Sequence, residues 1–366
     1  MTGPRLEIDL DKIGHNARTL VADSAAVGIS ITAVTKALLG LPALAVVMLE
    51  AGVVALGDSR IENIETMRAA GIEAPMVLIR SPMPSQIPRV VDSGVVSANS
   101  ELEVLGLLSA QAVRRGIDHG VLLMVELGDL REGVMGDRLL GVVARVLALP
   151  CLELRGIGAN LACRSGVVPD ALNMGHLSDH ADAIEARFGV EVAMISGGNS
   201  ANLAWALGSR SRERSRINNL RLGESILLGR EPLGRTPIDG LFTDTVTLVG
   251  EVIESIRKPL RPWGNRAQSA FGEPTGDDPT SDERTRRPAA CNSGWQTIVA
   301  IGHQDTDPAG LCPAEGHQII GASSDHLVLA TERRMPPGAE MSFQPNYSAL
   351  LRSATSPFVG LEVRSS

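Results

Sequence analysis

The sequence has few lysines and few aromatic residues. Among its 34 Lys and Arg residues only Lys12, Lys36 and Lys258 are lysines, and aromatic side chains make up 2% of the 366 residues, with a single tyrosine. Arginine cannot act as an amine nucleophile, because its guanidinium stays protonated. Amine chemistry therefore falls to the lysines. Lys36 is the strongest candidate, since apolar residues flank it on both sides in ITAVTKALLG, a poor setting for a surface lysine.

Cysteines and targeting signals are also sparse. Cys151, Cys163, Cys291 and Cys312 show no CxxC pair or other metal-binding spacing, so we expect reduced thiols and no metal site. The net charge of −8 argues against nucleic acid or an anionic membrane as the main partner. The N-terminal residues lack a basic region followed by an apolar one, so no secretion signal is expected. These features predict a cytoplasmic protein.

Eight short apolar runs alternate with segments of helical spacing in the first 225 residues. Because the runs are apolar through their length, they suit parallel strands covered on both faces. Eight β–α repeats predict an α/β fold with a (β/α)8 TIM-like barrel at 1–232, and a doubly wound open sheet is the structural alternative. The predicted strands are 29–36, 53–60, 74–80, 94–100, 120–131, 152–163, 190–200 and 218–225.

The pattern changes after Glu231. Residues 243–256 alternate like an antiparallel strand, and 261–293 is polar, rich in Pro, Gly and Arg, and predicted as a long loop. We expect a mostly β C-terminal domain at 233–366, whereas the opening run RLEIDL, 5–10, could join either domain. Further β structure is predicted at 295–305, 317–330 and 340–351.

Reactive side chains stand where the predicted barrel strands end, and these ends converge on one mouth, where active sites lie. ISGGNSANL, 195–203, places two glycines and small hydroxyl residues before a helix. This pattern can cradle a phosphate and is also typical of a tight turn with an N-cap. Arg221 could bind an anion, donate to a ring nitrogen or form a salt bridge. Together with Lys36, the set predicts a pyridoxal 5'-phosphate site in which the lysine forms a Schiff base.

These segments resemble the fold-type III pyridoxal phosphate enzymes, the alanine racemase superfamily, and the closest resemblance is to its ornithine racemase group. The matching runs extend from residue 6 to residue 359 in the same order. They include LEIDLDKIGHNAR, AVTKALLG, MVELGDLREGV, GIGANLAC, ISGGNSANL, INNLRLGESILLGRE and NYSALLRSATSPFV. The resemblance implies a pyridoxal phosphate-dependent amino-acid racemase that takes a proton from the substrate Cα with one base and returns a proton with another.

The resemblance also implies roles for individual residues. Lys36 would form the Schiff base and act as one of the two acid/base groups. An arginine at the pyridine nitrogen would not protonate that nitrogen, so the carbanion would be stabilised less fully and side reactions suppressed. The remaining implied roles are phosphate contact by Asn199, Ser200, Gly223 and Glu224, contact with the pyridine nitrogen by Arg221, cofactor lining by Asn160, and contact with the substrate carboxylate by Arg131.

The chain departs from alanine racemase at the second base, which in that enzyme is a tyrosine from the partner subunit's β domain. The only tyrosine here is Tyr347, which could bind phosphate or pack. His303, in AIGHQD, lies near the corresponding place, and imidazole suits proton transfer near neutral pH. Ser324 and Asp325 fall where the family reaches into the neighbouring subunit's site to meet substrate. The resemblance therefore implies a homodimer with shared active sites.

Several outcomes stay open at this stage. Ornithine is the expected substrate, and a basic side chain needs a carboxylate at the far end of the pocket, for which Asp129, Glu224 and Asp325 are candidates. Lysine, arginine or alanine could be racemised instead. The chain could also be a fold-type III enzyme that does not racemise, or an inactive relative that only binds the cofactor.

Overall fold

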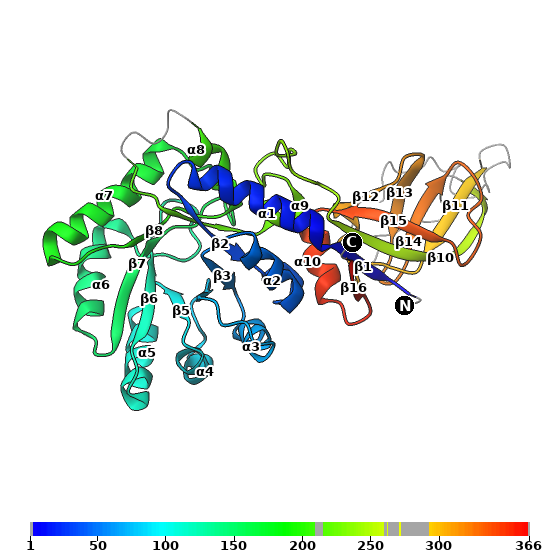
Figure 1. Ribbon diagram of the computed structural model, residues 1–366. Helices are drawn as coiled ribbons and strands as arrows, with labels where there is room; N and C mark the ends of the chain where they lie inside the picture. The colour runs from blue at the N-terminus through cyan, green and yellow to red at the C-terminus, as the bar shows by residue number, and fades with distance from the viewer. Residues whose placement is uncertain (1–2, 209–214, 260–261, 263–270, 272–292, 365–366) are drawn as a thin grey trace, which may run out of the picture. The chain divides into compact units, whose positions relative to one another are not determined.

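The computed structural model describes residues 3–208, 215–259, 262, 271 and 293–364, and these residues form two compact units (Figure 1). The barrel unit is Leu10–Thr245, and the β unit combines Met1–Asp9 with Val246–Arg364. This division differs from the predicted boundary at 232/233.

Residues 233–245 belong to the barrel unit because they are bonded to it. Arg230 forms a β-bridge with Pro237, and the Phe242 N–H donates to the Asn16 side chain at 2.8 Å. At the other end of the chain, the first strand leaves the barrel unit and joins the β unit. The choice that the sequence left open for 5–10 is therefore resolved by strand pairing, which places residues 5–9 in the sheet of the β unit.

Eight parallel strands close into a barrel, which confirms the predicted fold and excludes the open sheet. The last strand pairs with the first, so that Arg221 lies opposite Thr32. Each strand overlaps one of the eight predicted runs. The strands are β2 (Ser30–Val34), β3 (Ala55–Asp58), β4 (Met76–Leu78), β5 (Val96–Asn99), β6 (His119–Met124), β7 (Leu152–Gly158), β8 (Met194–Ser196) and β9 (Asn219–Leu222).

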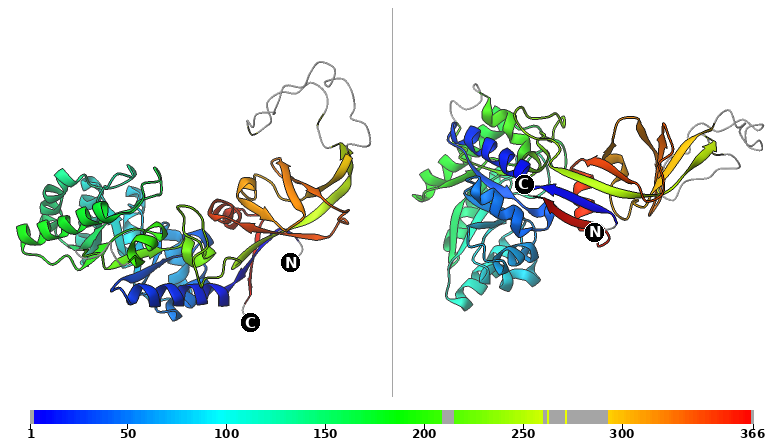
Figure 2. Two further views of the ribbon diagram at one scale, coloured as in Figure 1. Left: turned by 90° about the horizontal axis from the view of Figure 1, so that it is seen from above. Right: turned by 45° about the vertical axis from the view of Figure 1, so that its right-hand side comes forward.

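Helices follow the strands and surround the barrel (Figures 1 and 2). Their ends carry the expected signals: Asp170 and Asn173 form a capping box at the start of one helix, and Gly189 ends it with φ of 65°, a conformation that glycine adopts without strain. The α-helices of the barrel unit are α1 (Leu10–Ala25), α2 (Pro42–Glu50), α3 (Ile61–Ala69), α4 (Ile87–Asp92), α5 (Leu102–Arg115), α6 (Gly136–Ala148), α7 (Ala171–Phe188), α8 (Leu203–Leu207) and α9 (Glu224–Leu228).

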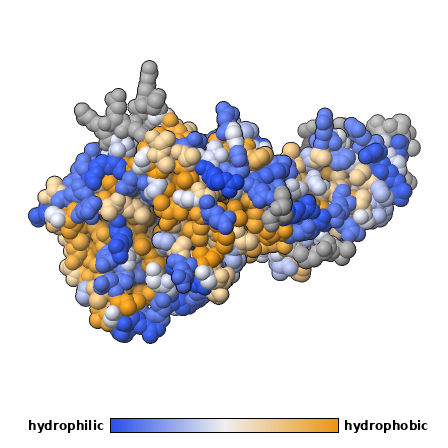
Figure 3. All heavy atoms as spheres, viewed as in Figure 1, coloured by the Kyte–Doolittle hydropathy of each residue, from blue (hydrophilic) through white to orange (hydrophobic). Residues whose placement is uncertain are grey.

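Short 3-10 helices begin two of the loops at the barrel mouth. They are η1 (Lys36–Leu38), directly after β2, and η3 (Ser200–Asn202), after β8; η2 (Pro84–Gln86) follows β4. On the face of the barrel unit that Figure 3 shows, hydrophobic and hydrophilic residues are interspersed. Within the described ranges, no helix has both the length and the apolar character that a membrane span requires.

The β unit is an eight-stranded sheet with the order β12-β15-β10-β11-β14-β13, and β1 pairs with β10 and β16. Its core includes Leu6, Leu248 and Phe343, all at most 1% exposed. The strands are β1 (Arg5–Asp9), β10 (Val246–Pro259), β11 (Ser293–Val299), β12 (Leu311–Pro313), β13 (His317–Ala322), β14 (Leu327–Thr331), β15 (Glu340–Pro345) and β16 (Gly360–Arg364), with η5 (Pro308–Gly310) and α10 (Tyr347–Thr355) between them.

One predicted β segment of this unit is only half correct. Residues 340–345 form β15, but 347–355 form α10. The cause is local: the Asn346 side chain accepts a hydrogen bond from the Ala349 N–H at 3.0 Å and caps the helix, as asparagine commonly does. The predicted long loop at 261–293 lies outside the described residues except at 262, 271 and 293.

Candidate active site

Lys36 stands at the carboxyl end of β2, as the first residue of η1, and is half-buried. The backbone around it is fixed by Asp58, which is fully buried at the end of β3. The Asp58 carboxylate accepts hydrogen bonds from Thr35 Oγ1 at 2.8 Å and Asn63 Nδ2 at 2.9 Å. Burial raises the pKa of Asp58, although these hydrogen bonds oppose the shift. Asp58 therefore holds the residue next to the lysine in place.

The turn after β8 contains the predicted phosphate cradle. Gly198 has φ of 149°, and a Cβ there would overlap the Asn202 side chain, so glycine is required. The Asn199 side chain accepts from the Ala201 N–H at 2.8 Å and donates to the Leu161 carbonyl at 2.8 Å and to Asn160 Oδ1 at 3.1 Å. Asn199 thus ties the β8 turn to the residues that follow β7.

A hydroxyl pair joins the β8 turn to the β9 turn. Ser200 Oγ lies 3.0 Å from Ser225 Oγ and accepts hydrogen bonds from the N–H groups of Ser225 at 3.2 Å and Gly223 at 3.4 Å. Glu224 lies between the last two residues and is half-buried. The four predicted phosphate residues therefore lie in two adjoining turns, and their contact with phosphate stays a prediction.

Arg221 on β9 is buried, with 6% of its surface exposed. Its guanidinium donates to Ser196 Oγ and to the Ala159 carbonyl, and no carboxylate of the described residues forms an ion pair with it. Burial lowers the pKa of Arg221 to about 10, and the positive charge of Arg131 acts in the same direction. Among the described residues, Arg221 therefore does not form the salt bridge that the sequence left open as an alternative. Because its hydrogen-bond partners are neutral, the positive charge of this guanidinium is not offset by them and can attract a ligand.

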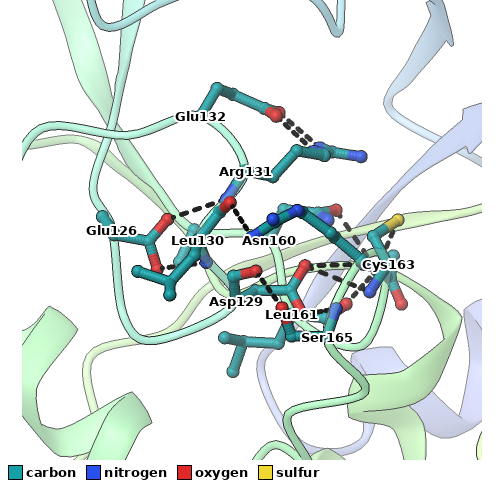
Figure 4. Close-up of polar contacts among 12 residues, drawn as sticks. Glu126, Asp129, Leu130, Arg131, Glu132, Asn160, Leu161, Cys163 and Ser165 are labelled. Atoms are coloured by element: carbon teal, nitrogen blue, oxygen red, sulfur yellow. Dashed lines mark hydrogen bonds and ion pairs between the residues drawn. The ribbon is translucent and has the colours of Figure 1, made fainter.

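Arg131 stands on the loop after β6, and two carboxylates shape that loop (Figure 4). Glu126 accepts hydrogen bonds from the N–H groups of Leu130 at 3.0 Å and Arg131 at 3.3 Å. Asp129, which is fully buried, accepts from the N–H groups of Arg164 at 2.9 Å and Ser165 at 3.0 Å. Burial opposes ionisation of Asp129, but its backbone hydrogen bonds lower its pKa below the ordinary value.

The role of Asp129 follows from these contacts. A carboxylate that is buried and bonded to backbone N–H groups anchors one loop to another, and it has no free face for a substrate ammonium. Asp129 is therefore excluded as the carboxylate that meets a basic side chain. The exposed Arg131 forms an ion pair with Glu132, the next residue.

Glu224, at the barrel mouth, has a pKa well above the ordinary value for a glutamate. Burial raises its pKa to about 7, the charge of Glu231 adds to this, and the charges of Arg235 and Lys36 oppose it. Glu224 and Lys36 are thus close enough to interact electrostatically. At neutral pH this carboxyl group is partly protonated.

The site fits pyridoxal phosphate in its donor set. The mouth offers an amine on Lys36, a charged guanidinium on Arg221, and a small-residue turn at 197–200. Asn160 Nδ2 is buried and has no hydrogen-bond partner among the described residues, so the mouth holds an unused donor. A phosphorylated pyridine aldehyde supplies the acceptors and the electrophile that such a set needs.

The predicted residues of the β unit form a second cluster. The N–H of His303 donates to the Ser323 carbonyl at 2.9 Å, and that of Gln304 to the Ser324 carbonyl at 2.8 Å. His303 is half-buried, and its ring lies 3.9 Å from that of Phe271, measured between ring centroids. The structure thus brings His303 beside Ser324 and Asp325.

The same cluster includes both ends of α10. Ser348 Oγ donates to Asp307 at 2.6 Å, and Ser356 Oγ lies 3.3 Å from Asp305. These contacts join α10, whose first residue is the half-buried Tyr347, to the loop that carries His303. Asp325 is exposed and is bonded to Ser324 and His326, whose hydrogen bonds lower its pKa.

Sequence reasoning missed two residues of the mouth. The sequence predicts Cys163 only as a reduced thiol with no role in the site, but its Sγ lies 4.0 Å from Asn199 Nδ2. Glu132 was passed over because it directly follows Arg131, and adjacent residues give no periodic signal. The position of Cys163 at the end of a predicted strand run was the signal that could have found it.

Comparison with known proteins agrees with this geometry. Residues 8–231 match the family described as alanine racemase, N-terminal domain. The chain is 36% identical to a lysine racemase of Thermotoga maritima over 98% of each chain. It is 32% identical to an ornithine racemase of Acetoanaerobium sticklandii, and the alignment covers 98% of this chain and 99% of that protein.

Solved structures show the same fold at lower identity. An alanine racemase from a D-cycloserine-producing Streptomyces lavendulae superposes with a TM-score of 0.74 and 17% identity, covering 100% of this chain and 98% of that one. A histidine racemase from Leuconostoc mesenteroides superposes with a TM-score of 0.70 and 17% identity, covering 99% of this chain and 98% of that one. Both likenesses concern the fold.

Proposed function

The chain belongs to the alanine racemase family and is a pyridoxal phosphate-dependent amino-acid racemase, and we propose that its substrate is a basic amino acid, ornithine first. Two observations support the substrate class. The two relatives with near-complete coverage are named for lysine and ornithine. The loop after β6 carries the ion pair Arg131–Glu132, which offers one charge of each sign. Ornithine comes first because the sequence motifs resemble the ornithine racemase group. Lysine is the alternative, because the chain is 36% identical to the lysine racemase and 32% identical to the ornithine racemase.

Pyridoxal phosphate, when bound, withdraws electrons from the substrate Cα and so makes its proton acidic. Within the chain, Lys36 would hold the aldehyde end of the group. Asn199, Ser200, Gly223 and Glu224 would contact its phosphate, and Asn160 would line its ring. Arg221 would donate to the ring nitrogen from its charged guanidinium, which does not release its proton at neutral pH.

The proton transfers fall to two bases. Lys36 Nζ would take or return the proton on one side of Cα, and a ring nitrogen of His303 would do so on the other. Two bases on opposite sides of Cα invert the centre, because one removes a proton from one face and the other delivers a proton to the opposite face. Tyr347, on the helix bonded to the His303 loop, would contact phosphate. Ser324 and Asp325, beside His303, would meet the substrate.

His303 belongs to the β unit and Lys36 to the barrel unit, and we propose that they meet across a homodimer, each site taking residues from both subunits. Two-fold symmetric dimers, whose interfaces are self-complementary, are the commonest form of oligomer. We also place the enzyme in the cytoplasm, as its scattered cysteines suggest.

A racemisation assay tests the substrate. The protein with added pyridoxal phosphate is incubated separately with L-ornithine, L-lysine, L-arginine and L-alanine, and chiral chromatography follows the D-isomers. We expect the highest kcat/KM for L-ornithine, with L-lysine next. Preference for L-alanine would refute the substrate class, and a decarboxylated or dehydrated product would show a different reaction on the same scaffold.

Lys36→Ala is the control for the cofactor site. Wild-type protein should show the absorbance of pyridoxal phosphate bound to an amine, and the variant should lose it. A protein that shows this absorbance but converts none of the four amino acids would be the inactive cofactor-binding relative.

A further inference from the structure

We propose that Glu132 recognises the side-chain ammonium of the substrate, an assignment that rests on the proposed function and adds a specificity residue to it. Glu132 directly follows Arg131, which is the arginine predicted to meet the substrate carboxylate. The two side chains form an ion pair on the loop after β6 (Figure 4). About a quarter of the Glu132 side chain is exposed, 26%, so its carboxylate is partly shielded from water and still open to a ligand.

The other carboxylates of this loop are already committed to the backbone. Glu126 binds N–H groups of its own loop, at Gly128, Leu130 and Arg131. Asp129 binds N–H groups of the loop after β7, including those of Arg164 and Ser165. Glu132 differs from both, because its hydrogen bonds among the described residues go to a side chain. A side-chain partner can rotate away, whereas the backbone partners of Glu126 and Asp129 are fixed.

Glu132 also lies within electrostatic reach of the cofactor end of the mouth. Asp129, on the same loop, accepts a hydrogen bond from the Cys163 N–H at 3.3 Å, and Cys163 Sγ lies 4.0 Å from Asn199 Nδ2. The charge of Glu132 also acts on Arg221 and raises its pKa. Arg221 is the residue assigned to the ring nitrogen. The pair Arg131–Glu132 is therefore part of the mouth and does not belong to a distant face of the barrel unit.

A basic amino acid complements this pair by exchange of partners. Its α-carboxylate replaces Glu132 on the Arg131 guanidinium, and its side-chain ammonium takes the place of Arg131 on Glu132. One ion pair becomes two, and no charge is left without a partner. A neutral amino acid would supply only the carboxylate and would leave Glu132 unpaired in a partly shielded position, which is costly. The pair thus favours basic over neutral substrates.

The two remaining candidates are less suited. Glu224 is partly protonated at neutral pH, because burial raises its pKa to about 7, and its neighbours are the phosphate residues. Asp325 is exposed, and its carboxylate is already bonded to Ser324 and His326. Neither has the half-shielded position and exchangeable partner that Glu132 has.

The test compares substrates that differ only in the terminal ammonium. Holoenzyme with Glu132→Gln is assayed with L-ornithine against L-norvaline, and with L-lysine against L-norleucine. Loss of a charged hydrogen bond predicts that kcat/KM for each basic amino acid falls roughly 10- to 100-fold, whereas kcat/KM for each neutral partner holds or rises. The basic-to-neutral ratio is the quantity that the proposal predicts.

The matched control is Glu153→Gln. Glu153 is also a glutamate ion-paired to an arginine, Arg155, and 43% of its side chain is exposed. It lies near the start of β7, at the barrel end opposite the mouth. This variant loses the same charge and the same kind of pair. It should leave all four kcat/KM values unchanged.

A second variant guards against a general loss of structure. Glu132→Asp keeps the charge but withdraws the carboxylate by one methylene, so kcat/KM for the longer L-lysine should rise relative to L-ornithine. Parallel losses with basic and neutral substrates in Glu132→Gln would overturn the proposal, since Glu132 would then only position Arg131. An unchanged ratio would overturn it as well. Wild-type enzyme that prefers L-norvaline to L-ornithine would instead refute the proposed function, and that result needs no variant.

Discussion

Ser200 Oγ and Ser225 Oγ lie 3.0 Å apart, and this contact links the turn after β8 to the turn after β9. Both hydroxyls are buried, and Ser200 Oγ also accepts two backbone N–H groups of the β9 turn. The two turns that are proposed to hold the cofactor phosphate are therefore one hydrogen-bonded unit.

Removal of that link should weaken cofactor binding. Ser200→Ala removes a proposed phosphate contact and the acceptor that orders the β9 turn through the N–H groups of Gly223 and Ser225. A hydrogen bond to a charged group contributes about 1.5–3 kcal/mol. We expect the Kd for pyridoxal phosphate, measured by absorbance titration, to rise roughly 10-fold or more. Ser225→Ala is the matched control: it removes the hydroxyl partner but leaves both N–H groups bonded, so its effect should be smaller. Equal effects would show that the acceptor role of Ser200 is unimportant.

The pKa of Glu224 predicts a pH dependence of stability. Its ordinary value is 4.5, and in the folded chain burial raises it to about 7. Between these values the folded protein keeps a proton that the unfolded chain has lost, so the free energy of unfolding falls as pH rises through this window. The shift corresponds to on the order of 3 kcal/mol.

Glu224→Gln tests this directly in the apoprotein. The variant cannot ionise at this position, so its unfolding free energy, from urea titrations at pH 5 and pH 8, should decline less than that of wild type. It should also be more stable than wild type at pH 8. Identical pH profiles for the two proteins would show that Glu224 titrates normally.

Some elements of the fold can be predicted from the sequence and others cannot. The eight barrel strands could be located because buried parallel strands are apolar through their length, and each strand lies in or beside its predicted run. The α10 helix was missed because its start depends on one cap, at Asn346, inside a segment that alternates like a strand. The first strand was ambiguous, since only pairing with β10 and β16 assigns it.

The site shows the same limit. The sequence placed Lys36, Arg221 and the glycine turn at strand ends, since those positions follow from chain order. It could not tell which acidic residue of the β6 loop can exchange its partner for a ligand. Asp129 and Glu132 are both acidic residues of one loop and differ in the contacts that their carboxylates make. The backbone N–H groups that Asp129 binds lie about 35 residues further along the chain, a separation that no local pattern reports.

His303 gives a prediction about both chemistry and assembly. His303→Ala should lower kcat by about 10²–10⁴-fold, the usual contribution of a general acid–base group, and should leave the cofactor absorbance intact. His176→Ala, at an exposed position on α7, is the control and should keep wild-type kcat. An unaffected rate in His303→Ala would remove this residue from the mechanism.

Mixed dimers extend that test to the shared site. If Lys36 and His303 of one site come from different subunits, then Lys36→Ala and His303→Ala protein, each inactive alone, should complement each other. Hybrids carry one intact site, so random reassociation of equal amounts should restore about a quarter of wild-type activity. A mixture that stays inactive, although hybrids form, would place both bases in the same subunit.

The central claim is that this enzyme exchanges the Cα proton of a basic amino acid, and proton exchange in D₂O tests it most directly. Holoenzyme is incubated with L-ornithine in D₂O, the Cα–H signal is followed by NMR, and the isomers are resolved by chiral chromatography. The account predicts loss of the Cα–H signal together with D-ornithine that grows until both isomers are equal, and neither change in Lys36→Ala. Retention of the Cα–H signal by ornithine and lysine alike, with the cofactor bound, would contradict it.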